Sequence, residues 1–66
     1  MNATVNGAAR ELPEGTTLGA LLRKLGVEGV AIAIAVNERV VPRATFEAHR
    51  LSEGDAVEII RAAAGG

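Results

Sequence analysis

The chain has 66 residues, with no cysteine, tryptophan or tyrosine, so it offers no disulfide, no thiolate zinc site and no thiol nucleophile. Seven basic and eight acidic residues give a formal net charge of −1, which does not favour binding to nucleic acid or to an anionic membrane. The length is that of one domain, and no apolar run approaches the roughly 20 residues that span a bilayer. We therefore expect a cytoplasmic domain that acts through a partner.

The N-terminal segment predicts a β-hairpin. Residues 1–5 alternate apolar and polar side chains, which is the period of a half-buried strand. Asn6 and Gly7 follow, and this dipeptide best supplies the two positive φ angles of a tight turn. Residues 8–12 should therefore return antiparallel to the first strand, until Pro13 stops them.

One amphipathic helix is predicted next. Thr16 or Thr17 can cap its start, and Gly26 is placed to end it in the left-handed conformation. Four leucines at the spacing i, i+3, i+4 and i+7 give it one apolar stripe: Leu18, Leu21, Leu22 and Leu25. Gly19 interrupts this stripe at a cost of about 1 kcal/mol relative to alanine, and we interpret it as a point of close approach by another segment.

Residues 30–36 form the clearest strand of the sequence, with large side chains on one face and alanines on the other. We expect the large face to pack under the helix. The alanine face has two interpretations. The apolar character of both faces favours burial on both sides, and the alternative is a shallow exposed surface for a partner.

Two shorter strands follow, at residues 39–41 and 56–60. Between them, residues 44–50 have some helical character, and Phe46 should reach the margin of the core. A hairpin, one helix and three later strands indicate an α+β roll of the β-grasp type, with a mixed sheet of about five strands packed on the helix.

The predicted domain covers residues 1–60, and residues 61–66 are expected to form a flexible C-terminal tail because they show no periodic pattern. No side chain predicts an active site. His49 has no acidic or serine partner at a recognisable spacing, and no phosphate-binding glycine loop or metal-ligand motif occurs. We expect no bound cofactor and no metal.

The last two residues, Gly65 and Gly66, suggest chemistry at a terminal carboxylate. Glycines have no Cβ, so a partner could draw them through a narrow slot. A carboxylate becomes an acyl donor once it is converted to a mixed anhydride, for instance by adenylation with ATP, and a sulfur, nitrogen or oxygen nucleophile can then attack. Composition alone does not decide between this chemistry and a frayed or truncated end.

Three segments of the sequence resemble the ThiS family of sulfur carriers: residues 36–43, residues 51–60 and the final Gly65-Gly66. The resemblance extends over the whole chain, including its length, the hairpin turn and the leucine helix. Glu38 departs from the pattern, since the family often has glycine there, which changes the turn more than the chemistry. The resemblance implies a ubiquitin-like β-grasp fold and a stoichiometric carrier that is not an enzyme.

The resemblance also implies partners. In that family an E1-like adenylyltransferase of the ThiF type adenylates the terminal carboxylate, here Gly66, with ATP. Sulfur from a cysteine desulfurase displaces AMP and leaves a thiocarboxylate, which a ThiG-type thiazole synthase uses to build the thiazole ring of thiamin. Gly65 would permit threading, and Arg43 and Arg61 are candidates for polar contacts near the tail. The sheet face beyond the helix is expected to dock the partners.

Three other functions stay open. The same tail could carry sulfur to molybdopterin, to tRNA thiolation or to another sulfur metabolite. It could instead form an isopeptide bond to protein lysines, as a ubiquitin-like modifier does. The chain could also be an adaptor whose glycines are incidental. The Val41-Pro42-Arg43 run and the short length favour thiamin.

Overall fold

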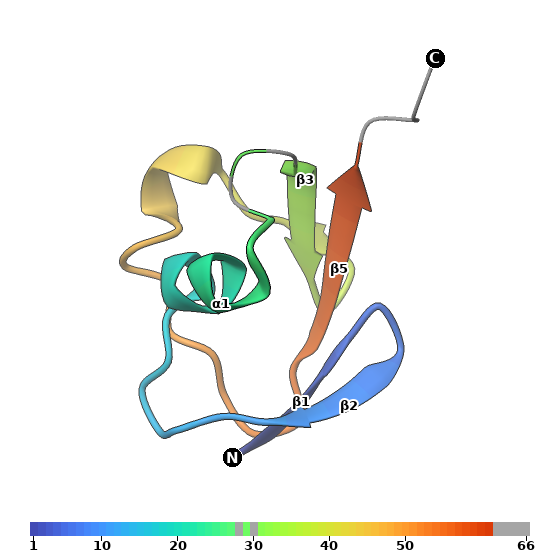
Figure 1. Ribbon diagram of the computed structural model, residues 1–66, viewed down its shortest axis with the longest axis vertical. Helices are drawn as coiled ribbons and strands as arrows, with labels where there is room; N and C mark the ends of the chain where they lie inside the picture. The colour runs from blue at the N-terminus through green and yellow to red at the C-terminus, as the bar shows by residue number, and fades with distance from the viewer. Residues whose placement is uncertain (28, 30, 62–66) are drawn as a thin grey trace.

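The computed structural model describes residues 1–27, 29 and 31–61. Within them, one mixed sheet packs against one α-helix, as predicted (Figure 1). The strands are β1 (Asn2–Val5), β2 (Ala8–Glu11), β3 (Ala31–Val36), β4 (Arg39–Val40) and β5 (Ala56–Arg61), and the helices are α1 (Leu18–Leu25) and the 3₁₀-helix η1 (Arg43–Thr45).

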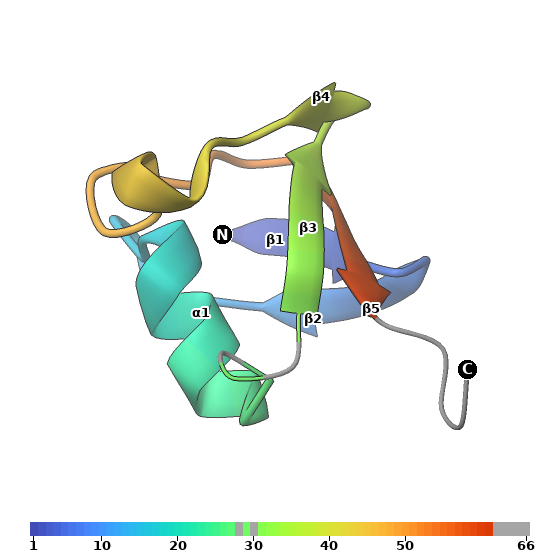
Figure 2. The same ribbon diagram turned by 90° about the horizontal axis from the view of Figure 1, so that it is seen from above.

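The last strand lies at the centre of the sheet, whose order is β2-β1-β5-β3-β4. β5 runs parallel to β1 and antiparallel to β3. Seen from above, α1 and η1 lie on one side of the sheet, and the described residues place no helix on its other side (Figure 2).

Two tight turns join the antiparallel pairs β1–β2 and β3–β4. Asn6 and Gly7 have φ angles of 49° and 85°, which are the two positive values predicted for this dipeptide. Asn37 and Glu38 repeat the arrangement at 52° and 69°. The first pattern was predicted from a common turn dipeptide, whereas Glu38 adopts a conformation that few non-glycine residues do.

The helix begins and ends where its sequence signals lie. Thr17 caps the start, with its Oγ1 accepting a hydrogen bond from the N–H of Ala20 at 3.1 Å. Gly26 adopts a φ of 72° and donates its N–H to the carbonyl oxygen of Arg23. Leu18, Leu21 and Leu22 are buried, so the predicted leucine stripe faces the sheet.

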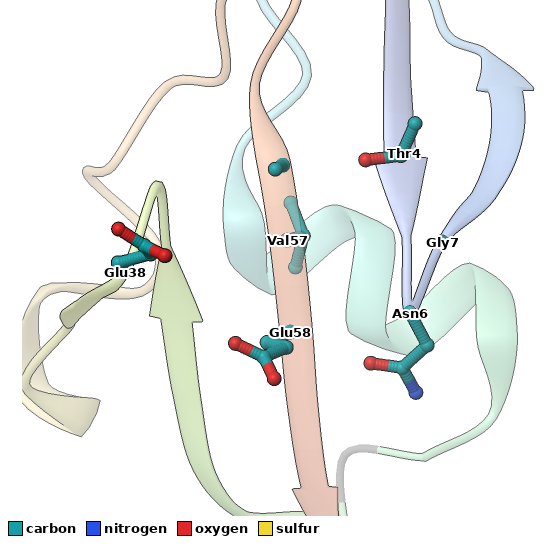
Figure 3. Close-up of a pocket in the computed structure, with 7 residues that line it drawn as sticks. Thr4, Asn6, Gly7, Glu38, Val57 and Glu58 are labelled. Atoms are coloured by element: carbon teal, nitrogen blue, oxygen red, sulfur yellow. The ribbon is translucent and has the colours of Figure 1, made fainter.

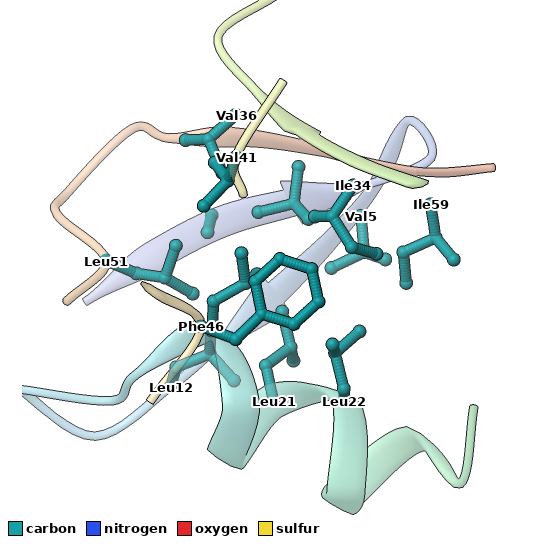
Figure 4. Close-up of a cluster of buried hydrophobic side chains, with 13 residues drawn as sticks. Val5, Leu12, Leu21, Leu22, Ile34, Val36, Val41, Phe46, Leu51 and Ile59 are labelled. Atoms are coloured by element: carbon teal, nitrogen blue, oxygen red, sulfur yellow. The ribbon is translucent and has the colours of Figure 1, made fainter. Parts of the chain in front are cut away.

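The core lies between this stripe and the inner face of the sheet (Figure 4). Ile34 and Val36 of β3 contribute to it, which confirms that the large face of that strand packs under the helix. Each fully buried aliphatic side chain stabilises the fold by about 1.5–3 kcal/mol relative to an exposed one. The side chains buried most completely are Leu18, Leu21, Ile34 and Val57.

The segment after β4 is less helical than predicted. Residues 44–50 do not continue as a helix, because only Arg43–Thr45 form a 3₁₀ turn. Phe46 turns its ring into the core, and Arg50 forms an isolated β-bridge with Thr17 at the start of α1. A longer helix would carry residue 50 away from this bridge, so tertiary contacts override the local helical tendency.

Gly19 is a point of close approach, as its sequence position suggested. Its N–H donates to the carbonyl oxygen of Phe46 at 3.0 Å, and a Cβ at this position would collide with the carboxylate of Glu47. That carboxylate accepts two hydrogen bonds from Arg23, at 2.6 and 3.1 Å. The bonds from Arg23 hold the pKa of Glu47 below its ordinary value.

The boundary of the domain needs a correction at its C-terminal end. Arg61 was predicted to begin the tail, but it is the last residue of β5 and pairs with Ala31 of β3. The pairing with β3 therefore extends the strand beyond the apolar residues that defined it in the sequence. The predicted tail at residues 62–66 lies outside the described residues.

Neither helix of the described chain has the length and apolar character that a membrane span requires.

Candidate functional site

The central strand β5 leads directly into the C-terminal segment that the sequence singled out (Figure 1). Its side chains alternate between the two faces of the sheet. Val57 and Ile59 point into the core, whereas Glu58 and Ile60 point to the opposite side. Hydrogen bonds to both neighbouring strands hold β5, so the chain enters residues 62–66 from the middle of the sheet.

The sheet face turned away from α1, here called the outer face, carries exposed apolar side chains. Cross-strand pairing places Val40, Ala35 and Glu58 in one row of this face, and Ala33 and Ile60 in the next. Val40 is 70% exposed and Ile60 is 43% exposed, and they are the exposed large hydrophobic residues of the described chain. They lie in different rows of the face, with Ala33 and Ala35 of β3 between their strands.

The alanine face of β3 is partly buried. Ala35 is only 6% exposed and Ala33 is half-buried. In the described part of the chain no second layer covers them, and Ala35 lies between the longer side chains of its cross-strand neighbours, Val40 and Glu58. The expected burial on both sides therefore holds at Ala35 and only in part at Ala33, and use of this face by a partner stays a prediction.

A shallow hollow of about 510 Å³ lies on the outer face where the two tight turns flank β5 (Figure 3). Its lining comprises Thr4, Asn6, Gly7, Glu38, Ala56, Val57 and Glu58. Glu38 and Glu58 give the hollow negative charge, so the outer face is acidic near the turns and apolar near Ile60. The hollow is open to solvent, which suits contact with a partner better than enclosed catalysis.

The predicted contact residues do not lie together. Arg61 is exposed at the end of β5. Arg43 begins η1, with its guanidinium carbon 5.8 Å from the centre of the Phe46 ring. Both views draw η1 beside α1 and away from the end of β5 (Figure 1, Figure 2). Gly65 and Gly66 lie outside the described residues.

Side chains with catalytic chemistry are dispersed over the described residues. His49 is half-buried near the start of α1, where its carbonyl oxygen accepts the N–H of Leu18. Within residues 1–27, 29 and 31–61, no three histidine or acidic side chains gather as a metal site would require. What this part of the chain presents is an exposed sheet face and a central strand that ends at Arg61.

Two asparagines hold β5 in a way that the sequence reasoning did not foresee. The Oδ1 of Asn6 accepts the N–H of Ile59 at 2.8 Å, and the Oδ1 of Asn37 accepts the N–H of Ala56 at 2.9 Å. The sequence assigns Asn6 only to the first turn, and Asn37, with Glu38, only to the next. An asparagine directly after a strand is a signal for side-chain bonds to the backbone, but the distant strand that it contacts cannot be read from the sequence.

Comparison with known proteins gives matches over almost the whole chain. The model of the ThiS family matches residues 3–66. Sulfur carrier protein ThiS of Escherichia coli is 30% identical over 66 residues, with both chains covered completely. Two proteins named thiazole synthase, from Paramagnetospirillum magneticum and Magnetococcus marinus, are 32% and 36% identical over 66 residues. The chain spans only 20% of the length of each of these two.

Two solved structures match the chain at a similar sequence identity. The crystal structure of the thiamine biosynthesis protein ThiS from Geobacter metallireducens superposes with a TM-score of 0.83, at 33% identity and with full coverage of both chains. A solution structure of a thiamine biosynthesis protein from the same organism gives 0.79, at 33% identity, covering all of this chain and 88% of the other. The sheet order and the single main helix described above are therefore shared with a known fold.

Proposed function

The chain belongs to the ThiS family, with its ubiquitin-like β-grasp fold, and on this premise we propose that it is the sulfur carrier for the thiazole moiety of thiamin. The observation that carries the proposal is the extent of the match. The family model runs to residue 66, and the Escherichia coli carrier is matched along its entire length. The matched range therefore extends over positions 65 and 66, where the proposed chemistry would occur.

The proposed reaction uses the Gly66 carboxylate as an acyl group. One carboxylate oxygen attacks the α-phosphate of ATP in the active site of an E1-like adenylyltransferase, and pyrophosphate leaves. The outer sulfur of a cysteine-desulfurase persulfide then attacks the acyl carbon and displaces AMP, which gives an acyl disulfide. A thiol reductant cleaves the S–S bond of this intermediate, and the thiocarboxylate remains. Gly65 and Gly66 have no side chains, which lets the partner enclose the backbone closely. The chain is a co-substrate in this scheme, and the reactive side chains belong to its partners.

The outer face is the proposed docking surface for the adenylyltransferase. Val40 and Ile60 expose apolar area that binding would remove from water, which is favourable by about 25 cal/mol per Å². Glu38 and Glu58 add negative charge at the turn end of the face, which complements a basic group on the partner. Arg61, the last residue of β5, stays a candidate for a polar contact. Arg43 lies on η1, on the other side of the sheet, and no part of this docking proposal rests on it.

Thiazole synthase is the proposed acceptor of the sulfur. Support comes from the two longer proteins of that name, because each contains a stretch that matches this whole chain. A carrier and an acceptor on one polypeptide meet at a high effective concentration, which suits a stoichiometric transfer. This observation favours thiazole over molybdopterin or tRNA as the destination. Because the scheme consumes ATP, we place the reaction in the cytoplasm.

The test is the intact mass of the chain before and after incubation with ATP, the adenylyltransferase and a sulfide source. The expected result is a gain equal to the exchange of one oxygen for one sulfur, mapped to Gly66 by fragmentation. A variant without Gly66 serves as the matched control and should show no gain. An unchanged mass for the intact chain, with an enzyme that is active on a known carrier, would contradict the proposal and favour the modifier or adaptor alternatives.

A further inference from the structure

The contact between β1 and β5 ends before β5 does. The two strands pair through Thr4 with Ala56 and Val5 with Val57, and the N–H of Asn6 donates to the carbonyl oxygen of Val57 at 2.9 Å. Bonds in a parallel ladder recur at every second residue, so the next N–H of β5 that needs an acceptor belongs to Ile59. The backbone of β1 cannot supply one, because Asn6 already turns away with a φ of 49°.

The side chain of Asn6 fills that place. Its Oδ1 accepts the N–H of Ile59 at 2.8 Å, in a partly buried position. The residue therefore has two functions at once: its backbone adopts the left-handed conformation of the turn, and its amide oxygen continues the ladder by one more bond. Without this oxygen the Ile59 N–H would lack its partner, which is unfavourable for a backbone donor shielded from water.

Asn37 makes the corresponding contact at the other end of the strand. Its N–H donates to the carbonyl oxygen of Ala56 at 2.8 Å, and its Oδ1 accepts the N–H of Ala56 at 2.9 Å. Like Asn6, it is the first residue of a tight turn with a positive φ. The difference between the two is their place: Asn37 holds the first residue of β5, whereas Asn6 holds the half of β5 that leads to the tail.

We propose that Asn6 is a positioning residue for the carrier tail, because its side chain holds Ile59 and so sets the place of Ile60 and Arg61. This inference rests on the proposed function. Ile60 is an exposed apolar residue of the outer face, and it follows directly on the residue that Asn6 holds. Release of the Ile59 N–H would leave the end of β5 held on its β3 side alone, through the pairs of Ile60 with Ala33 and of Arg61 with Ala31, and would let it move relative to β1. Only part of the chains would then hold the end of β5 in the arrangement that the partner binds, and the apparent affinity would fall by that fraction.

Three variants separate positioning from folding. Asn6→Gly keeps the positive φ and removes the acceptor oxygen, whereas Asn6→Asp keeps an acceptor oxygen of the same length. Asn37→Gly is the matched control, because it makes the same change at the same turn position on the remote end of β5. It also removes the bond from the Nδ2 of Asn37 to Asp55, so it is at least as disruptive to the fold.

The measurements are amide hydrogen exchange at Ile59 and the KM and kcat of adenylation, for the full chain with the adenylyltransferase. For Asn6→Gly we expect Ile59 to exchange about fivefold to tenfold faster, since a hydrogen bond contributes about 1 kcal/mol. We also expect KM to rise severalfold with kcat unchanged, because the substitution lowers the fraction of chains that can bind the enzyme and does not change the reacting group. Asn6→Asp should restore both quantities, and Asn37→Gly should leave KM unchanged.

The proposal is overturned if Asn37→Gly raises KM as much as Asn6→Gly does, because the effect would then follow stability alone. An unchanged KM for Asn6→Gly, or a failure of Asn6→Asp to restore it, overturns it as well. A failure of the proposed function is seen separately, as a wild-type chain that is not adenylated, and the role in tail positioning falls with it. Hydrogen exchange at Ile59 still reports in that case whether Asn6 holds the strand.

Discussion

Ile59 and Ile60 are neighbours in β5 that point to opposite faces of the sheet, so alanine at each position should separate folding from docking. Ile59 is 9% exposed and belongs to the core, and Ile59→Ala should lower the free energy of unfolding by about 2–5 kcal/mol. At about 0.05–0.15 kcal/mol per residue, the total free energy of unfolding of a chain of this length is about 3–10 kcal/mol. The substitution therefore removes a large share of the stability.

Ile60→Ala should behave differently. The side chain is already 43% exposed, so its truncation should lower the free energy of unfolding by only about 1 kcal/mol. Docking would bury the exposed part, and at about 25 cal/mol per Å² its loss corresponds to about 1–2 kcal/mol of binding free energy. Since 1.4 kcal/mol is a factor of ten, KM for adenylation should rise by about tenfold while kcat stays the same.

Urea unfolding followed by circular dichroism measures the first quantity, because the chain has no tryptophan or tyrosine for fluorescence. Adenylation kinetics with the partner enzyme measure the second. Where Ile59→Ala does not fold, Ile59→Val is the milder substitute, with an expected loss of about 0.5–1.5 kcal/mol. The reasoning is refuted if Ile60→Ala destabilises the chain as much as Ile59→Ala, or if it leaves KM unchanged.

Three further predictions concern the helix and the tail. Gly19→Ala should displace the carboxylate of Glu47 from Arg23. It should still raise the melting temperature, because the gain of about 1 kcal/mol in helix propensity exceeds the contribution of an exposed ion pair. A lower melting temperature would contradict this prediction. Glu47→Gln should lower the melting temperature at neutral pH. Because the fold lowers the pKa of Glu47, the stabilisation is present above the ordinary glutamate pKa and is lost as the pH falls through the folded value; a difference from wild type that persists in acid would refute the assignment. Removal of Gly66 should abolish the gain of sulfur by mass spectrometry and leave the melting temperature unchanged, whereas retention of the gain would place the chemistry elsewhere.

The elements that depend on local signals were predictable from the sequence. Leucine spacing defined the face of α1, and Thr17 and Gly26 lie at its two ends, where capping chemistry places such residues. The Asn6-Gly7 turn fixed the first hairpin in the same way. In each case the determining residues are close together in the chain, so their pattern is visible without knowledge of the fold.

Features that depend on distant contacts were not predictable in detail. The helical tendency of residues 44–50 yields to the burial of Phe46 and to the bridge between Arg50 and Thr17. The strand β5 extends to Arg61 because β3 offers a partner there. Asn6 and Ile59 are 53 residues apart, so the contact that underlies the proposed positioning exists only once the sheet has formed.

The register of β5 places Ile60 on the outer face, next to the residue with which the strand ends. Side chains alternate along a strand, so the burial of Ile59 forces residue 60 to face outward. A polar residue at position 60 would satisfy solvent equally well, as the exposed Glu58 does two residues earlier on the same face. Isoleucine there contributes about 1 kcal/mol through the part of its side chain that is covered, and the rest of its apolar area is exposed. A partner that buries Ile60 while it takes up the tail from the same strand gives that area a use, because one element then sets both the docking surface and the approach of the reactive carboxylate.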